Sequence, residues 1–91
     1  MQWSVSYTRS AARAIRRLDP QIQNRIRAAL VVLSEEPLRG KPLQLTLRGL
    51  RSWRTGDWRI VYRVREQEIE ILVVAIGHRR DVYDRLREQL R

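Results

Sequence analysis

The sequence predicts an α+β fold, in which helices pack on one face of a small antiparallel β-sheet of about four strands. Two patterns lead to this prediction. Apolar residues recur at helical spacing in the first third of the chain, and from residue 45 the spacing changes to two, as in strands. The length of 91 residues and the hydrophobic content of 43% fit one folded domain spanning residues 1–91.

The N-terminal segment predicts a strand followed by a helical hairpin. Apolar and polar residues alternate over residues 3–7, which is the pattern of a half-buried strand. Thr8 is a suitable N-cap for a short helix, and Asp19 with Pro20 supplies the N-cap and first position of a second helix. The second helix ends before Pro37, and its apolar stripe comprises Ile22, Ile26, Ala29, Leu30 and Leu33.

The remainder of the chain predicts three antiparallel strands and a short C-terminal helix. The strands lie near residues 51–54, 58–65 and 69–76, and the turn at 55–57 has the sequence Thr-Gly-Asp. The last ten residues before the C-terminal arginine, 81–90, have the apolar spacing of a helix. We therefore expect the helical hairpin to cover one sheet face.

Alternation within residues 58–65 assigns side chains to the two sheet faces. Ile60, Tyr62 and Val64 share one side, which we expect to meet the helices. The arginines of this strand occupy the other side, and two arginines of the neighbouring strand lie close to them. The sequence thus predicts an open basic sheet face formed by Arg51, Arg54, Arg59, Arg63 and Arg65.

The positive charge is concentrated in the middle of the chain. There are 19 Lys and Arg residues against 10 Asp and Glu, for a net charge of +9, and residues 39–65 alone carry +7. Arginines in this segment alternate with Trp53, Trp58 and Tyr62, a composition that suits RNA or single-stranded nucleic acid. A general preference for arginine over lysine would not explain why acidic residues avoid this segment.

Several classes of site and protein are disfavoured by composition. The chain has no cysteine and one histidine, which excludes disulfide and thiolate chemistry and makes a zinc site unexpected. We expect neither a metal nor a small-molecule cofactor. No apolar run approaches the ~20 residues needed to cross a bilayer. We expect a cytoplasmic protein that does not bind membranes.

Two segments resemble a known family. Residues 54–62, RTGDWRIVY, and residues 74–83, VAIGHRRDVY, closely resemble signature segments of the RelE/ParE superfamily of type II toxin–antitoxin toxins, and the whole chain fits its pattern. The second segment looks more like the RelE branch. This resemblance implies the RelE-like microbial ribonuclease fold. It also implies metal-free, ribosome-dependent cleavage of mRNA in the A site by 2′-hydroxyl attack, which would inhibit translation under stress.

The resemblance also assigns roles to individual residues. Arg59 matches the catalytic arginine that holds the phosphate, and Arg79 matches a second arginine near the leaving group. Tyr83 matches a tyrosine near the scissile nucleotide, and Arg54 supports the phosphate. His78, the sole histidine, is the side-chain type that ordinarily exchanges protons near neutral pH. Whether His78 or Tyr83 transfers the proton stays open, since each also has an ordinary structural role.

One position departs from the family pattern. Some members carry a lysine pair on the first of these strands, whereas Ser52 and Arg54 stand there in this sequence. Arginine does not readily deprotonate, so lysine-dependent base catalysis is in doubt and Arg54 is expected to act by charge alone. Further contacts to RNA or the ribosome are expected from other cationic side chains, namely Lys41, Arg48, Arg51, Arg63, Arg65 and Arg80.

The expected partners are the ribosome, mRNA and a cognate acidic, RelB-like antitoxin. Two alternatives remain at this point. One is a ParE-like toxin that inhibits DNA gyrase, against which the joint presence of Arg59, Arg79 and Tyr83 argues. The other is a basic RNA-binding module without catalysis, because every candidate catalytic residue is also suited to binding phosphate.

Overall fold

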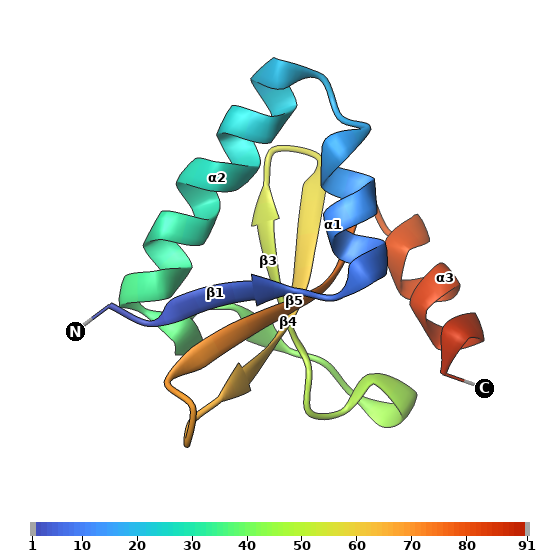
Figure 1. Cartoon of the computed structure of the whole chain (residues 1–91). Coiled ribbons are helices and arrows are strands. Elements are labelled where there is room, and N and C mark those ends of the chain that lie inside the picture. The colour runs from blue at the N-terminus through green and yellow to red at the C-terminus, as the bar shows by residue number, and fades with distance from the viewer. Residues whose placement is uncertain (1, 91) are drawn as a thin grey trace.

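The structure is a five-stranded mixed sheet with three α-helices, and as a computed structural model it describes residues 2–90 (Figure 1). The strands lie side by side in the order β1-β5-β4-β3-β2. In chain order the elements are β1 (Ser4–Tyr7), α1 (Arg9–Arg16), α2 (Pro20–Glu35), β2 (Lys41–Pro42), β3 (Arg51–Thr55), β4 (Trp58–Arg65), β5 (Glu70–His78) and α3 (Asp81–Gln89). Short 3₁₀ turns cover Pro37–Arg39 and Leu45–Leu47.

This architecture confirms the predicted α+β class, with two differences in the sheet. There are five strands instead of about four, because β2 pairs only two residues with β3 and is too short to show a period. The sheet is mixed, because β1 runs parallel to β5, with Ser4 opposite Glu70 and Tyr7 opposite Val73. Alternation identifies a strand but does not specify the direction of its partner.

The helical hairpin begins and turns as the sequence predicts. The Thr8 hydroxyl accepts a hydrogen bond from the Ala11 N–H at 3.2 Å and so caps α1. Asp19 is the N-cap residue of α2 and Pro20 its first residue, although the Asp19 side chain makes no capping bond. The two helices diverge from their short connection as an inverted V (Figure 1).

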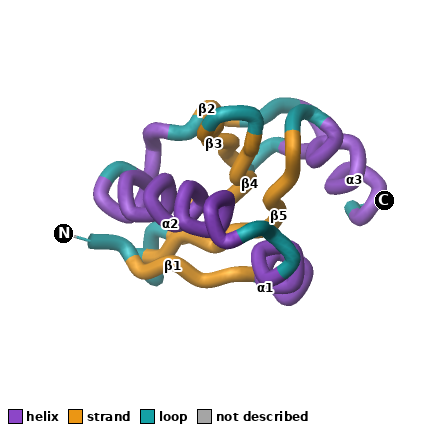
Figure 2. Tube along the Cα trace, turned by 90° about the horizontal axis from the view of Figure 1, so that it is seen from above, coloured by secondary structure: helices purple, strands orange, loops and turns teal. Residues whose placement is uncertain are grey.

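Two hydrophobic cores lie on opposite faces of the sheet. The larger one joins α1 and α2 to the sheet, and it contains Ile60 and Tyr62 with Val64 packed against it, as predicted. The smaller one lies under α3, which Figure 2 shows across the sheet from α2. It consists of Leu47, Leu50, Val61, Val82 and Leu86. The sheet face predicted to be open is therefore partly covered, because the fully buried Val61 lies among its arginines.

A β-bulge in β5 places two consecutive residues against the core under α3. Val61 of β4 pairs with Ala75 and the next residue, Tyr62, pairs with Val73, so Val74 is the extra residue. Val74 and Ala75 consequently both pack against the smaller core, although they are consecutive in a strand. Within residues 2–90, no helix is long and apolar enough to span a membrane.

Candidate functional site

A basic groove lies between β3, β4, the segment after β2, and α3. Its volume is about 580 Å³. The side chains of Ser52 and Tyr83 line it together with one acidic residue, Asp84. The cationic residues that line it are Lys41, Arg54, Arg59, Arg80 and Arg87. Five cationic groups against one carboxylate make the groove suitable for an anionic ligand.

The pairing of the strands explains how these groups meet. Arg54 of β3 lies directly opposite Arg59 of β4, and Lys41 of β2 lies opposite Ser52 of β3. Ser52 and Arg54 are two residues apart on one strand, so they share a sheet face. Helix α3 supplies the remaining wall through Tyr83 and its neighbours.

Arg59 is the most constrained cation of the groove. Its guanidinium carbon lies 5.8 Å from the centroid of the Tyr83 ring, within cation–π range. Its Nε atom is buried and has no hydrogen-bond partner among the described residues. A buried donor without an acceptor lowers stability, and an oxygen atom of a bound anion in the groove would satisfy it.

Tyr83 is fixed to the floor of the groove by a second contact. Its Oη atom lies 2.7 Å from Oγ of Ser52, a buried serine, and either hydroxyl can donate the bond. The ring is thus held between Ser52 and the Arg59 guanidinium. The orientation of the phenol is therefore set by contacts with two residues of the sheet as well as by its position on helix α3.

Arg54 is partly engaged by the turn that follows it. Its Nε atom donates to the Gly56 carbonyl at 2.8 Å, and its Nη2 atom lies 4.0 Å from the Asp57 carboxylate. The side chain is nonetheless mostly exposed along the groove. The turn therefore orients the guanidinium without neutralising it closely.

His78 and Arg79 lie next to the groove but do not line it. Nε2 of His78 lies 3.9 Å from the Asp57 carboxylate, and its ring contacts Trp58 edge to face at 5.2 Å. Arg79 has a φ of +60°, and its backbone N–H donates to the Asp57 carbonyl at 2.7 Å. The structure thus brings Arg54, Arg59 and Tyr83 together in the groove, whereas His78 and Arg79 lie outside it, the first beside the Asp57 carboxylate and the second bonded to the Asp57 carbonyl through its backbone. Asp57 connects the two sets, because Arg54 also lies near its carboxylate.

The other cationic residues singled out in the sequence divide in the same way. Lys41 and Arg80 line the groove. Arg48 and Arg63 are exposed outside it. Arg51 lies opposite Tyr62 and so on the other sheet face from Arg54 and Arg59, with its guanidinium directed toward the Leu38 and Gly40 carbonyls. The prediction that it belongs to the open basic face is therefore wrong.

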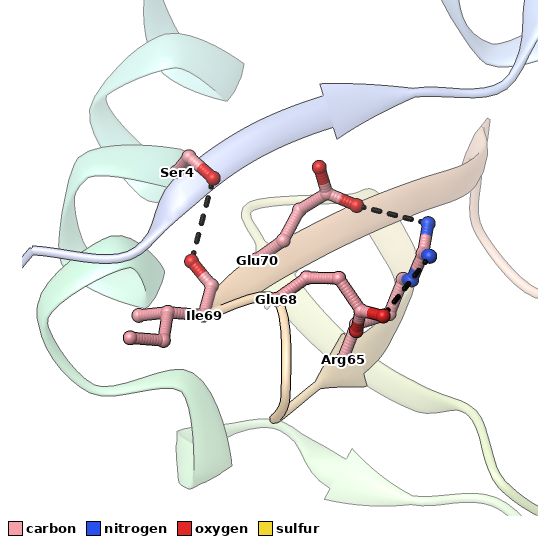
Figure 3. A network of polar contacts seen from close by, with 5 residues as sticks. All are labelled: Ser4, Arg65, Glu68, Ile69 and Glu70. Carbon is pink, nitrogen blue, oxygen red and sulfur yellow. Dashed lines mark hydrogen bonds and ion pairs between the residues drawn. The ribbon is translucent and has the colours of Figure 1, made fainter.

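Arg65 lies at the β4–β5 turn within a polar network (Figure 3). Its guanidinium is 3.5 Å from the Glu68 carboxylate and 3.1 Å from that of Glu70. In the same network the Ser4 hydroxyl donates to the Ile69 carbonyl at 3.3 Å (Figure 3). Arg65 therefore has acidic partners of its own.

Arg87 and Ser52 line the groove, which was not predicted from the sequence. Arg87 follows Tyr83 by four residues, so helical spacing alone places both on one face of α3. Ser52 shares a strand face with Arg54, but its contact with Tyr83 depends on how α3 packs. Among residues 2–90, no three His, Cys, Asp or Glu side chains are grouped so that they could hold a metal ion.

Comparison with known proteins finds relatives among the toxins of type II toxin–antitoxin systems. Residues 5–83 match the family model described as the ParE toxin of the type II toxin–antitoxin system parDE. The chain is 38% identical over 91 residues to Toxin RelG of Mycobacterium tuberculosis, covering 93% of this chain and 100% of that protein. It is 34% identical over 87 residues to Toxin RelE of the same organism, covering 89% and 86% respectively.

Solved structures give the same result. The toxin–antitoxin complex RelBE2 of M. tuberculosis contains a chain with a TM-score of 0.81 and 34% identity, covering 87% of this chain and 100% of that one. The isolated E. coli RelE toxin has a TM-score of 0.74, covering 98% and 99%, and at 17% identity it shows the shared fold alone. The chain belongs to the RelE/ParE superfamily of toxins of type II toxin–antitoxin systems.

Proposed function

We propose that this toxin is a metal-free endoribonuclease that cleaves mRNA in the ribosomal A site. The observation that supports the proposal most is the position of Arg59. Its buried Nε atom, which has no hydrogen-bond partner within residues 2–90, lies in a groove lined by five cationic residues, and its guanidinium lies beside the Tyr83 ring. Such a site stabilises the negative charge that develops on a phosphate during RNA cleavage.

The proposed reaction needs no water. The 2′-oxygen of a ribose forms a bond to the adjacent phosphorus while the bond from phosphorus to the 5′-oxygen breaks. The 2′-hydroxyl loses its proton and the departing 5′-oxygen gains one, which leaves a 2′,3′-cyclic phosphate and a 5′-hydroxyl. The protein must therefore position the phosphate, stabilise its charge and assist two proton transfers.

The groove residues fit these tasks. The planar guanidinium of Arg59 can bind two nonbridging oxygens, with Arg54 beside it and Lys41 at the edge contributing charge. Tyr83 has a hydroxyl within the groove and a ring on which a base can stack, so we assign it to nucleotide positioning and proton transfer. Arg80, which follows Arg79 in the chain, adds a further cation to the groove.

The partner of this toxin is proposed to be an acidic, RelB-like antitoxin. The related M. tuberculosis toxin was solved as the toxin–antitoxin complex RelBE2. A net charge of +9 here favours an acidic partner that covers the basic surface, and such covering would block RNA.

Primer extension on programmed ribosomes tests the proposal. Purified toxin is incubated with ribosomes that hold a defined mRNA, and the 5′ ends produced are mapped. We expect cuts within the A-site codon that disappear with Arg59→Ala and persist with Arg13→Ala, an exposed arginine on α1. Intact mRNA with the wild-type protein would overturn the proposal.

A ParE-like action on DNA gyrase is the second candidate, because the matching family model describes ParE toxins. The same protein is therefore assayed for gyrase-dependent DNA breaks. Breaks with intact mRNA would assign the chain to this function. Ribosome binding without either product would indicate a non-catalytic RNA-binding module.

A further inference from the structure

The segment that leads into the groove is held at its backbone by two side chains of the sheet. The Gly40 N–H donates to Oη of Tyr62 at 2.9 Å, and that hydroxyl donates to the Pro37 carbonyl at 2.7 Å. Arg51 adds two bonds from Nη1, to the Leu38 carbonyl at 3.1 Å and to the Gly40 carbonyl at 2.7 Å. We call Tyr62 and Arg51, with these four bonds, the loop clamp.

The tyrosine of the loop clamp is rigidly placed. Tyr62 belongs to the central strand β4, its side chain is 0% exposed, and its ring is part of the larger core. Burial raises the pKa of this phenol, although the Gly40 hydrogen bond and the Arg51 charge oppose the shift. The hydroxyl therefore remains protonated at physiological pH and can donate to Pro37.

Gly40 is the residue that permits this close approach. Its φ of −69° is accessible to any residue, so backbone strain does not require glycine here. A Cβ atom at this position would collide with Oη of Tyr62 and would lie 2.8 Å from a ring carbon. The space normally filled by a side chain is thus filled by the hydroxyl that holds the loop.

Lys41 follows Gly40 directly and depends on this support. The strand it belongs to, β2, pairs only two residues with β3, and so short a ladder holds its position weakly. Lys41 lies opposite Ser52, the partner of Tyr83, and lines the basic groove. The four hydrogen bonds of the loop clamp therefore fix the backbone just before Lys41.

We propose that Tyr62 and Arg51 are positioning residues that hold Lys41 at the edge of the groove, where its ammonium group contacts an RNA phosphate. The inference rests on the proposed function, since it takes RNA as the ligand of the groove. Arg51, expected from the sequence to contact RNA itself, then acts through the loop, because its guanidinium donates to loop carbonyls.

A double-mutant cycle on RNA binding tests the proposal. The variants are Tyr62→Phe, Lys41→Ala and their combination, with Tyr7→Phe on β1 as the matched control, and the probe is a labelled single-stranded RNA at low salt. We expect Tyr62→Phe to weaken binding several-fold, to the same degree as Lys41→Ala. The double variant should bind no more weakly than Lys41→Ala. Additive losses, or wild-type affinity of Tyr62→Phe, would overturn the inference.

A second clamp variant and a hydrogen-exchange measurement test the inference even if Tyr62→Phe does not fold. If Tyr62→Phe fails to fold by circular dichroism, Arg51→Ala takes its place in the cycle. An Arg51 that contacted RNA directly would then give an additive loss and overturn the inference. Hydrogen exchange at the backbone amides of Gly40 and Lys41 should accelerate in the clamp variant, and unchanged exchange would also contradict the inference.

These outcomes separate the loop clamp from the proposed function. Wild-type toxin that binds RNA but leaves ribosome-bound mRNA intact would refute the nuclease and leave the cycle valid. Wild-type toxin that cleaved ribosome-bound mRNA but bound no free RNA even at low salt would support the nuclease and overturn this inference. Normal cleavage and RNA binding by Tyr62→Phe would refute the loop clamp alone.

Discussion

At the scale of single residues, the groove concentrates groups that oppose folding. Arg54 and Arg59 are directly cross-strand partners, and like charges in that relation are destabilising. The buried Nε of Arg59 adds an unsatisfied donor. A residue that destabilises the free protein but fits a bound phosphate is typical of a functional site.

Replacing Arg59 by methionine should therefore separate stability from activity. Methionine replaces the cation–π contact with the Tyr83 ring by a thioether–aromatic contact and removes the charge facing Arg54, so we expect an equal or higher melting temperature. Cleavage on programmed ribosomes should fall by about 100-fold or more, as expected for loss of a transition-state contact. Thermal melts and primer extension check both results, with Arg13→Met as control. A variant that unfolds, or that cleaves normally, would argue against the assignment.

The two candidates for proton transfer also make a residue-scale prediction. Tyr83 lines the groove, whereas His78 lies outside it beside Asp57. We therefore expect Tyr83→Phe to slow single-turnover cleavage substantially more than His78→Gln. A larger loss in the histidine variant would instead assign the proton transfer to His78.

The buried hydroxyl of Tyr62 should make stability depend on pH in the alkaline range. Its pKa in the folded protein is raised by burial, whereas in the unfolded chain it is near ~10. Above pH ~10 the unfolded state thus binds fewer protons than the folded state, and the free energy of unfolding falls as pH rises. Urea titrations followed by circular dichroism should show a shallower fall in Tyr62→Phe than in the wild type. Equal slopes would contradict this.

The residue-scale predictions from sequence succeeded where regular structure fixes a side chain. Alternation on β4 correctly placed Ile60 and Tyr62 in the core. It gave no information about Arg79, because the chain leaves the strand there and adopts a φ of +60°. The prediction that Arg51 shares a sheet face with Arg54 was wrong, although alternation was enough to exclude it, because the two residues are three apart on one strand. Only its particular partners, the Leu38 and Gly40 carbonyls, depend on how distant parts of the chain assemble.

At the scale of elements, helix α3 is a wall of the groove that is held against the sheet by a small hydrophobic core. Its buried residues are Val82 and Leu86, which contact the smaller core. Its approach to β5 is close, because a Cβ on Gly77 would lie 2.7 Å from Cβ of Val82. The absent side chain of Gly77 is therefore what lets α3 pack on the sheet.

Gly77→Ala should accordingly displace α3. Overpacking of this kind costs about 1–3 kcal/mol, which we expect as a lower free energy of unfolding. The displacement would also separate Tyr83 from Ser52 and reduce cleavage. Chemical denaturation and primer extension measure the two effects, and Leu90→Ala is the control because Leu90 is 57% exposed. Full activity of Gly77→Ala would show that cleavage does not depend on how closely α3 packs against β5.

The elements themselves were largely predictable, but their assembly was not. Periodicity located α1, α2, α3 and the three long strands, because their apolar residues recur at the spacing of a helix or a strand. The two-residue β2 carries no period, and the parallel pairing of β1 depends on contacts across the whole chain. The groove arises from that assembly, since β2, β3, β4 and α3 each contribute to it.

At the scale of the whole molecule, most of the positive charge is separated along the chain from most of the acidic residues. The central segment 39–65 carries +7, and its cations divide between the groove and other contacts. At the β4–β5 turn, Arg65 is bound by Glu68 and Glu70 (Figure 3). Net charge alone therefore overstates how many cations are free to bind a polyanion.

This separation predicts how RNA binding responds to salt. Five cationic residues line the groove, and one of them, Arg87, is paired with the Asp84 carboxylate at 3.1 Å. If the other four each neutralise one phosphate, a single-stranded RNA should show a slope of log K against log salt of about −3, at ~0.7 per phosphate. Arg80→Ala should reduce the magnitude of the slope by about 0.7, because one phosphate contact is lost. Arg65→Ala should leave it unchanged, because that guanidinium already has two carboxylate partners. Fluorescence anisotropy at several salt concentrations measures all three proteins. Equal slope changes in the two variants would mean that RNA responds to overall charge and that the groove is not its specific site.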